Sequence, residues 1–376
     1  MTTAHADVVI VGAGIVGLAH AHTAARAGHR VVVVERDHRC VGASIRNFGF
    51  VTVTGQGEGD TWRRARASRD VWAEVAPRAG IPIEHHGLWL LAHRPEAAAV
   101  LEAFMRTPMA EGLELVTPRE ASRRNPALNT RGARAALYSP HELRVESRLA
   151  IPRLASWLAE VHGVRFVFGE TVTGVDHGSV RTPARTLRAE RVVVCTGADL
   201  TGVAAPALAG HALRLTRLQM LRVRPLPDLE LPSAVMGDLS LVRYRGYAAL
   251  PEAGLLRTRL ELEEPASLAA GIHLIVVQSA DGTLVVGDSH HEGMTPEPFA
   301  SEAVDELILR HLRETIDIER VEVVERWTGV YPVGAAADCV IEAPDARTRV
   351  VVVTSGTGAS TAFGIAADVF AHWSRG

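Results

Sequence analysis

A glycine-rich turn near the N-terminus is the clearest chemical signature in this chain of 376 residues. It has the spacing G-x-G-x-x-G and follows a β-branched run at residues 8–11. In this pattern Gly12 permits a sharp turn, Gly14 lets a pyrophosphate approach the backbone, and Gly17 allows close helix packing. Free N–H groups at the start of the following helix attract phosphate. The spacing therefore predicts a phosphate-binding turn between a strand and a helix.

An acidic residue follows at the distance that a dinucleotide site requires. Residues 30–34 have the pattern of a second strand, and Glu35 ends it. A carboxylate placed about 20 residues after the glycines can hold a ribose hydroxyl. Together these features predict a dinucleotide site; the alternative is a glycine turn that binds nothing. NAD and FAD share this fingerprint, so other parts of the chain must decide between them.

Two further loops of small residues could line the same nucleotide. Residues 42–49 carry one cation and one amide just past the second strand, on the edge along which a dinucleotide extends. Residues 354–361 follow a buried strand and precede a helix, so their N–H groups could stabilise an anion or an electron-rich ring. The alternatives are a solvated loop in the first case and a simple helix cap in the second.

Composition excludes several classes of function. The formal net charge is −3 and neither an acidic nor a basic tail is present, so neither nucleic acid nor an anionic membrane is indicated as a partner. No uninterrupted apolar window of about 18 residues predicts a membrane span. The 40 residues counted as lysine plus arginine are all arginine, so chemistry based on lysine is not available.

The cysteines and histidines do not predict a metal site. Cys40, Cys195 and Cys339 are widely spaced and odd in number, which fits neither a metal motif nor a disulfide framework. His85 and His86 are adjacent, so on a strand they would point to opposite sides. The N-terminal apolar run belongs to the glycine fingerprint and does not have the pattern of a signal peptide. We expect a cytoplasmic protein with free thiols.

The expected elements form an α/β protein in which the first sheet is interrupted. A helix is predicted over residues 95–111, and a buried strand at residues 191–195 returns to the first sheet. Residues 211–223 alternate as a strand, and a more irregular, β-rich region that contains residues 243–247 follows. A last buried strand, at residues 348–353, leads into the C-terminal loop.

Four segments, in this order, resemble the FAD-dependent amine and amino-acid oxidoreductases related to glycine oxidase, sarcosine oxidase and D-amino-acid oxidase. They are the glycine turn with Glu35, residues 42–44, residues 195–198 and residues 354–358. In addition, "ERWTGVYP" at residues 325–332 is similar to the family's strand into the flavin. The resemblance covers nearly the whole chain. It favours FAD, because an NAD-only dehydrogenase does not need the C-terminal loop.

The resemblance implies an α/β fold with a Rossmann-like FAD-binding domain and an interleaved α+β substrate domain built on an antiparallel sheet. It assigns residues 1–60, 140–208 and 325–376 to the FAD-binding domain. It assigns residues 61–139 and 209–324 to the substrate-binding domain.

The resemblance also implies specific cofactor contacts. Glu35 would hold the adenosine ribose, the backbone of Val172 would meet adenine, and residues 356–361 would lie against the pyrimidine side of the ring. The predicted FAD-binding residues are Gly12, Ala13, Gly14, Ile15, Gly17, Glu35, Arg36, Ala43, Ser44, Asn47, Gly49, Val172, Thr196, Gly197, Gly356, Thr357, Gly358, Ala359, Ser360 and Thr361. Sarcosine-oxidase-like enzymes attach FAD through a cysteine near Tyr331. The nearest one here is Cys339, so we expect non-covalent FAD.

Departures from the family pattern bear on the substrate. Where glycine-oxidase-like enzymes place an arginine just before the proline of this strand, this chain has Tyr331, and a second expected arginine falls at Ala359. The bidentate carboxylate clamp is therefore missing. The lysine that sarcosine-oxidase-like enzymes use for oxygen activation is missing as well. Either oxygen or an electron-carrier protein could thus reoxidise the flavin.

The segments "SIRNFGF" and "GDSHHEG" are similar to a branch of the family associated with aminophosphonate breakdown. A phosphonate dianion calls for a different set of donors, and Asn47 joins the candidates in this role. The predicted substrate residues are Arg46, Arg243, Arg245 and His290, and the predicted catalytic residues are His290 and Tyr331. Each arginine could instead be a surface charge, and His290 a turn residue with its hydrogen bonds satisfied.

The predicted function is hydride transfer to FAD from the carbon next to an amine. The imine would then hydrolyse to an aldehyde or keto acid plus an amine or ammonia. The predicted substrate is 2-aminoethylphosphonate or its N-methyl form; the second hypothesis is an oxidase of the glycine or sarcosine type. A flavin-binding subunit without turnover is the hypothesis from another class. The sequence leaves open whether the protein is a monomer or a homo-oligomer.

Overall fold

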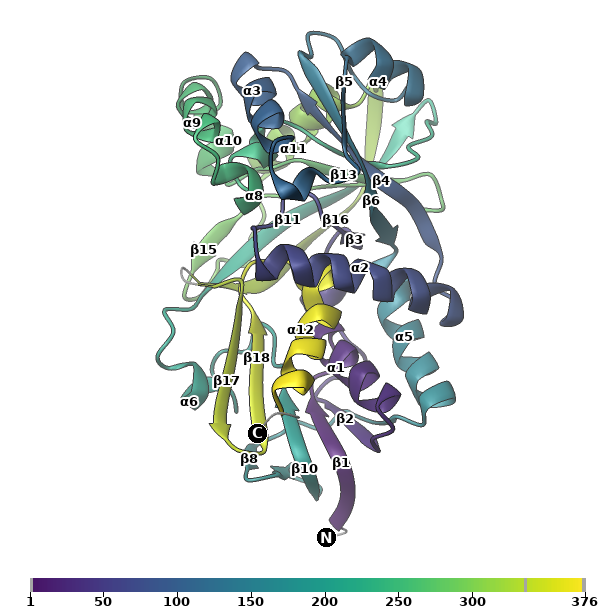
Figure 1. Cartoon of the computed structure of the whole chain (residues 1–376), viewed down its shortest axis with the longest axis vertical. Coiled ribbons are helices and arrows are strands. Elements are labelled where there is room, and N and C mark those ends of the chain that lie inside the picture. Colours follow the sequence, from purple (N-terminus) through teal and green to yellow (C-terminus); the bar gives the residue numbers. More distant parts are fainter. Residues whose placement is uncertain (1–2, 335–336, 374–376) are drawn as a thin grey trace.

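The computed structural model describes residues 3–334 and 337–373, which form two sheets with their helices, one above the other along the longest axis (Figure 1). The first sheet has eight strands: β1 (Thr3–Val11), β2 (Val31–Glu35), β7 (Arg165–Phe168), β8 (Gly174–Asp176), β9 (Ser179–Arg181), β10 (Thr186–Val194), β17 (Cys339–Asp345) and β18 (Thr348–Val353). Their order is β17-β18-β10-β1-β2-β7, with β8 and β9 attached to β10.

The central strands of this sheet are parallel and buried on both faces. Val8 and Ile10 of β1 belong to the core on one face, whereas Val9 and Val11 belong to the core on the other. This explains why the strands read as continuous valine and isoleucine runs. One face is covered by α1 (Ile15–Arg26), α2 (Asp60–Arg78), α5 (Ser147–His162) and α12 (Gly358–Trp373). The other face is covered by the β8–β9 hairpin and α6 (Ala205–Leu208).

The order of these strands creates a natural ligand site. β2 and β7 follow on one side of β1, and β10 and β18 follow on the other, all in parallel. The direction of winding therefore reverses between β1 and β10. In open α/β sheets, ligands bind at the carboxyl ends of the strands beside such a switch point.

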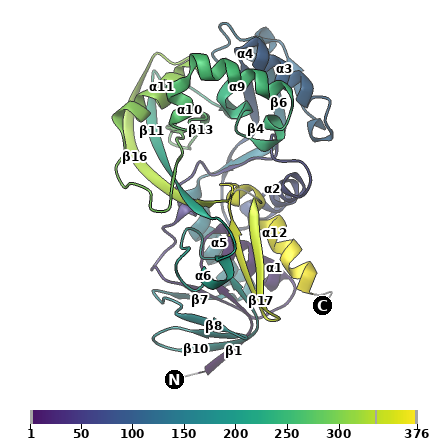
Figure 2. The ribbon, with the colours of Figure 1, turned by 90° about the vertical axis from the view of Figure 1, so that its left-hand side faces the viewer.

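The second sheet is mostly antiparallel and carries its own core (Figure 2). Its ten strands are β3 (Phe50–Val51), β4 (Ile83–Ala92), β5 (Glu114–Val116), β6 (Ala135–Val145), β11 (Arg214–Leu226), β12 (Ala234–Met236), β13 (Ile275–Gln278), β14 (Leu284–Gly287), β15 (His291–Gly293) and β16 (Arg320–Val333). The helices around it are α3 (Pro95–Phe104), α4 (Pro118–Arg124), α7 (Asp238–Leu241), α8 (Arg245–Ala248), α9 (Glu252–Glu263), α10 (Pro265–Ala269) and α11 (Glu302–Thr315). Two 3₁₀ turns are η1 (Ala43–Ile45) and η2 (Pro108–Ala110).

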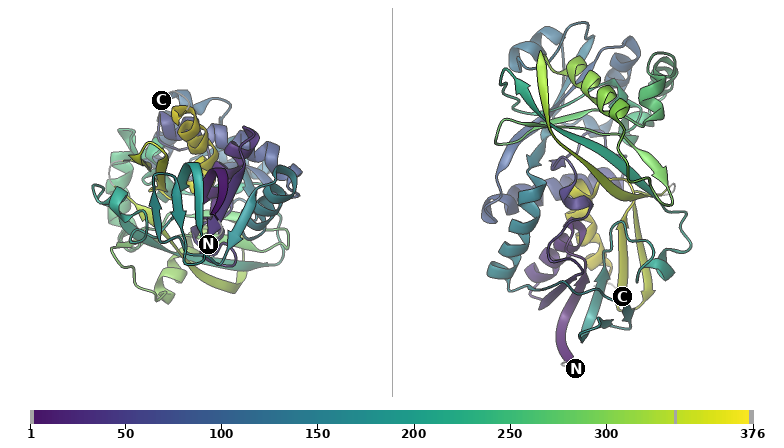
Figure 3. Two further views of the ribbon diagram at one scale, coloured as in Figure 1. Left: turned by 90° about the horizontal axis from the view of Figure 1, so that it is seen from below. Right: turned by 180° about the vertical axis from the view of Figure 1, so that it is seen from behind.

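One long strand pair joins the two halves of the molecule (Figure 3). β11 and β16 pair from Arg214 opposite Val333 to Leu226 opposite Arg320. At its end β16 reaches the first sheet, where Val333 forms a bridge with Ser355. This strand therefore carries Tyr331 from the second sheet to the loop that precedes α12.

Two expectations about elements are wrong. The region around Arg243 is not β-rich, because α7 to α10 occupy most of residues 238–269. The helix expected over residues 95–111 ends at Phe104 and is followed by η2. Thr107 precedes Pro108, and a residue before proline is disfavoured in the α region.

The predicted domain ranges stay a prediction. The second sheet takes β3, and parts of β6 and β16, from residues that were assigned to the FAD-binding domain. Within residues 3–334 and 337–373, no helix is both long and apolar enough to cross a bilayer.

Candidate cofactor and active site

A cavity of about 750 Å³ is lined by residues of both sheets. One end is formed by the glycine turn, Glu35 and residues after β10, at the switch point of the first sheet. The other end is formed by Tyr331 of β16 and the loop before α12. The volume is in the range of cofactor and small-molecule sites.

The glycine turn has a conformation that only glycine can adopt here. Gly12 has φ +101°, and a Cβ on it would lie 2.3 Å from the carbonyl oxygen of Cys195. A Cβ on Gly17 would lie 1.9 Å from the carbonyl oxygen of Gly12. The turn therefore packs directly against the end of β10, and α1 packs directly against the turn.

The N-terminus of α1 faces this cavity. Its N-cap residue, Gly14, makes no side-chain cap, and the first turn contains no acidic residue. The backbone N–H of Ile15 donates to Ser44 Oγ at 2.9 Å. Gly14, Ile15 and Ser44 all line the cavity. An open helix N-terminus of this kind favours a bound phosphate.

Glu35 is braced at the end of β2. Its Oε2 accepts a hydrogen bond from the Ala13 N–H at 2.7 Å, and its Oε1 accepts one from the Asp37 N–H at 3.1 Å. The carboxylate is buried and lines the cavity beside the glycine turn. Its position is therefore fixed before any ligand binds.

At the far end, β16 meets the C-terminal loop. Gly356 has φ +73°, and a Cβ there would lie 2.8 Å from Cζ of Tyr331. Burial raises the pKa of Tyr331 to about 12, so its hydroxyl stays protonated at neutral pH. Ser355 and Thr357 share a hydrogen bond of 2.8 Å between their hydroxyls, just before α12 begins. The first turn of α12 therefore opens onto the cavity beside a phenol that can donate a hydrogen bond.

The sequence profile of the family described as FAD dependent oxidoreductase (DAO) matches residues 7–373. The chain belongs to this family of flavoenzymes. FAD is therefore its cofactor. The cavity offers groups suited to FAD at both ends: the N-terminus of α1 and the Glu35 carboxylate at one end, and the loop before α12 at the other.

Several solved structures share the fold over nearly the whole chain. Glycine oxidase from Geobacillus kaustophilus is 22% identical with a TM-score of 0.77, and the match covers 99% of this chain and 95% of that one. L-proline dehydrogenase from P. horikoshii is 18% identical with a TM-score of 0.77, covering 97% and 92%. L-α-glycerophosphate oxidase from Mycoplasma pneumoniae, solved with FAD bound, is 17% identical with a TM-score of 0.74, covering 98% and 95%. No curated protein matches the chain.

Most of the residues predicted to bind FAD line the cavity of the flavoenzyme, and three do not. The Ala13 N–H donates a hydrogen bond to Glu35, and Thr361 is buried within α12. Gly49 packs against the backbone, where a Cβ would lie 1.7 Å from the Val145 carbonyl oxygen. Asn47 lines the cavity, but its side chain binds the backbone of Ala43 and Gly49. That the lining residues bind FAD stays a prediction.

The three candidate arginines differ in the partners that their guanidinium groups already have. Arg46 donates to the carbonyl oxygens of Val41 and Thr328, and Arg245 forms an ion pair with Asp338 at 2.9 Å. Arg243 is exposed, lines the cavity and has no carboxylate partner within the described ranges. It is therefore the cation most available to an anionic substrate.

A buried polar cluster beside Arg243 was only partly predicted. His290 was a candidate, but the structure adds Asp288 and His273, and all three line the cavity. His273 Nε2 lies 3.1 Å from Asp288 Oδ1, and His290 Nε2 lies 3.8 Å from Asp288 Oδ2. These side chains could also hold a metal ion, which the sequence did not predict. The D-x-H spacing of Asp288 and His290, in the short segment between β14 and β15, was the available signal.

Burial and neighbouring charged groups determine which side chains of this cluster are ionised. Burial lowers the pKa of His290 to about 3, so its ring is neutral. Burial alone would raise the pKa of Asp288, but the neighbouring histidines and Arg243 lower it below the usual value. The cluster therefore presents a carboxylate and a neutral imidazole to the cavity.

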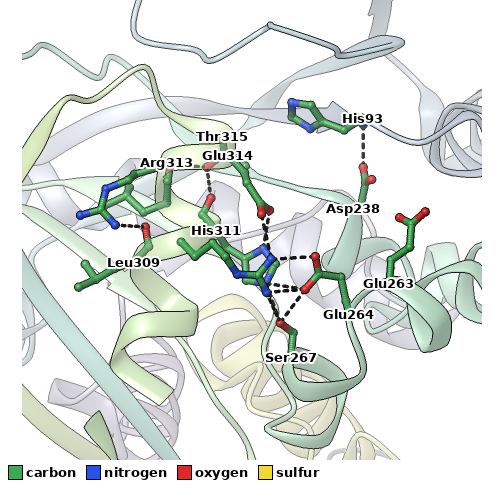
Figure 4. Close-up of polar contacts among 12 residues, drawn as sticks. His93, Asp238, Glu263, Glu264, Ser267, Leu309, His311, Arg313, Glu314 and Thr315 are labelled. Carbon is green, nitrogen blue, oxygen red and sulfur yellow. Dashed lines mark hydrogen bonds and ion pairs between the residues drawn. The ribbon is translucent and has the colours of Figure 1, made fainter. Parts of the chain in front are cut away.

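A second polar cluster lies near α11, away from this cavity (Figure 4). His311 Nε2 lies 2.8 Å from Ser267 Oγ, and His311 Nδ1 lies 2.6 Å from Glu314. This arrangement has the connectivity of a Ser-His-acid triad. Ser267 is fully buried, however, and its hydroxyl also bonds Glu264 at 3.0 Å. A nucleophile needs access to substrate, so we assign this cluster a structural role.

Replacing Glu264 by glutamine is expected to lower the free energy of unfolding by about 2 kcal/mol at pH 7, because charge-assisted hydrogen bonds are lost. Burial raises the pKa of Glu264, but Arg310, His311 and Ser267 together outweigh this and lower it. The carboxylate therefore stabilises the fold above its unfolded pKa, and this contribution disappears as the pH falls through the lowered pKa. Urea denaturation at pH 7 and in acid measures both effects. The exposed Glu302→Gln serves as the control, and an equal loss there would contradict the assignment.

Proposed function

We propose that this flavoenzyme oxidises the C–N bond of a small amine that also carries an anionic group. The observation that carries the proposal is Arg243, which lines the cavity beside the buried carboxylate of Asp288 and has no carboxylate partner of its own within the described ranges. Bound FAD supplies the two-electron acceptor for this chemistry. The oxidised product is an imine, which hydrolyses to an aldehyde or keto acid plus an amine or ammonia.

Neighbours with the same fold support an amine as substrate. One is a glycine oxidase, one an L-proline dehydrogenase and one an iminodiacetate oxidase. Tyr331 and Ala359 stand where the resemblance led us to expect arginines, so the anion must be held differently here. We propose 2-aminoethylphosphonate or its N-methyl form as substrate. A tetrahedral phosphonate suits charge-assisted hydrogen bonds from a guanidinium.

The chain's own groups have separate tasks in this proposal. Arg243 binds the anion and orients the substrate. Tyr331 remains protonated and can donate a hydrogen bond. His290 remains neutral and can accept one through Nε2. Either oxygen or an electron carrier reoxidises the flavin, and the chain has no lysine to assist oxygen.

We also propose that FAD is bound non-covalently. Burial raises the pKa of Cys40 to about 11 and that of Cys339 to about 12. Burial raises the pKa of Cys195 as well. These thiols are protonated at neutral pH and hence poor nucleophiles. Three free cysteines also suit a reducing compartment, which supports a cytoplasmic location.

An anaerobic panel of amines tests the proposed function. The holoenzyme is mixed with 2-aminoethylphosphonate, its N-methyl form, glycine and sarcosine, and flavin bleaching is followed. We expect the phosphonates to reduce the flavin with the highest kcat/KM. Faster reduction by glycine or sarcosine would favour an amino-acid oxidase. A flavin that no amine bleaches would favour a binding subunit without turnover.

A further inference from the structure

We infer that Asp288 and His290 form a subsite for the ammonium group of a zwitterionic substrate whose anion binds Arg243. This inference rests on the proposed function and adds a group that selects charged amines. It pairs His290, which the sequence already indicated, with Asp288, which it did not.

Hydrogen bonding fixes which atom of His290 faces Asp288. His290 Nδ1 lies 2.9 Å from the carbonyl oxygen of Gly271. A carbonyl can only accept, so Nδ1 must carry the proton and Nε2 must carry the lone pair. Nε2 lies 3.8 Å from Asp288 Oδ2. Two acceptors therefore face each other, and no described residue places a donor between them.

Both facing acceptors belong to side chains that are largely withdrawn from solvent. The side chains of Asp288 and His290 are only 6% and 5% exposed. Asp288 Oδ1 is buried as well and has no hydrogen-bond partner, since its contact with His273 is not aligned as a hydrogen bond. A buried acceptor without a partner destabilises the protein. Hydrogen bonds from a ligand to these acceptors would therefore contribute more binding free energy than the same bonds in open solvent.

An ammonium group meets this requirement in charge and in geometry. It brings three donors and one positive charge to an ionised carboxylate and a neutral imidazole. Charge-assisted hydrogen bonds of about 2.8 Å from a single nitrogen can reach both acceptors, since these lie only 3.8 Å apart. The substrate of the proposed reaction carries such a nitrogen. Before the adjacent carbon releases hydride, the ammonium passes one proton to His290 Nε2, which carries a lone pair, because only the neutral amine can form the imine.

A divalent metal ion is the competing occupant, because His273, Asp288 and His290 could ligate one. We favour the ammonium group because of Arg243. Its positive charge acts on all three side chains and lowers their pKa values. It would oppose a doubly charged ion more strongly than a singly charged one. A zwitterion also brings its own anion to pair with Arg243, which a metal ion does not.

The test compares two ligands that differ in the amine: 2-aminoethylphosphonate and ethylphosphonate. Ethylphosphonate binding is read from the perturbation of the flavin spectrum in the holoenzyme. Binding of the amine is read from the saturation of anaerobic flavin reduction, or from the spectrum where no reduction occurs. Asp288→Asn should weaken binding of the amine at least about thirtyfold and change binding of ethylphosphonate less than about threefold. His291→Gln serves as the neighbouring control, because His291 does not line the cavity, and should change neither.

Equal losses for both ligands, or no loss for the amine, would overturn the ammonium subsite. So would zinc binding that Asp288→Asn abolishes while binding of the amine stays unchanged. Failure of the proposed function has a different result: no amine bleaches the flavin. In that case the selective loss of amine binding in Asp288→Asn would still support the subsite.

Discussion

Replacing Gly12 by valine is expected to give a protein that purifies without FAD. Gly12 has φ +101°, a conformation that costs a residue other than glycine about 1–3 kcal/mol. In addition, a Cβ would lie 2.3 Å from the Cys195 carbonyl oxygen, so β1 and β10 must separate. Both strands end at the switch point where the N-terminus of α1 faces the cavity. The ratio of flavin to folded protein measures the loss.

Two comparisons make this prediction specific to the turn. Gly254→Ala lies in α9, where a Cβ would meet nothing within 4 Å, so this variant should retain FAD. Circular dichroism of Gly12→Val shows whether the chain still folds. If the folded variant carries one FAD per chain, the glycine turn is not the phosphate-binding element.

Replacing Arg243 by methionine is expected to lower kcat/KM for 2-aminoethylphosphonate by a factor of about 100 or more. The variant keeps most of the side-chain volume but removes the cation that has no carboxylate partner in the described ranges. Two charge-assisted hydrogen bonds of about 1.5–3 kcal/mol each account for a loss of this size. Arg243→Lys should recover only part of the activity, because a lysine cannot make the bidentate contact.

Controls separate this effect from a general change in surface charge. Arg106→Met removes an exposed arginine paired only with Glu252 and should leave kcat/KM within about twofold. Arg245→Met should have a smaller effect than Arg243→Met, because Arg245 is already neutralised by Asp338. Full activity in Arg243→Met would show that another group holds the anion.

The parts of the fold that the sequence predicted are those set by local pattern. The valine runs of β1, β2 and β10 and the turn at Gly12 are each specified by neighbouring residues. The match to the flavoenzyme family confirmed the α/β fold class and FAD as the cofactor. The short helices α7 and α8 were missed because four residues carry too little helical periodicity to recognise.

The sequence indicated individual residues of the site, but not which of them the fold brings together. Asp288 and His273 are fifteen positions apart and meet because the β13–β14 hairpin folds back. No local pattern reports such a pairing. Nothing in the sequence showed which of Arg46, Arg243 and Arg245 has a free charge. Only their partners in the fold show that the first and the third are already engaged.

A crystal structure of the holoenzyme would show whether one FAD spans both ends of this cavity. We expect electron density with the adenosine ribose beside Glu35, the pyrophosphate at the N-terminus of α1, and the flavin ring against the loop before α12 near Tyr331. Density for FAD in any other place, or with its ring away from residues 356–358, would contradict it.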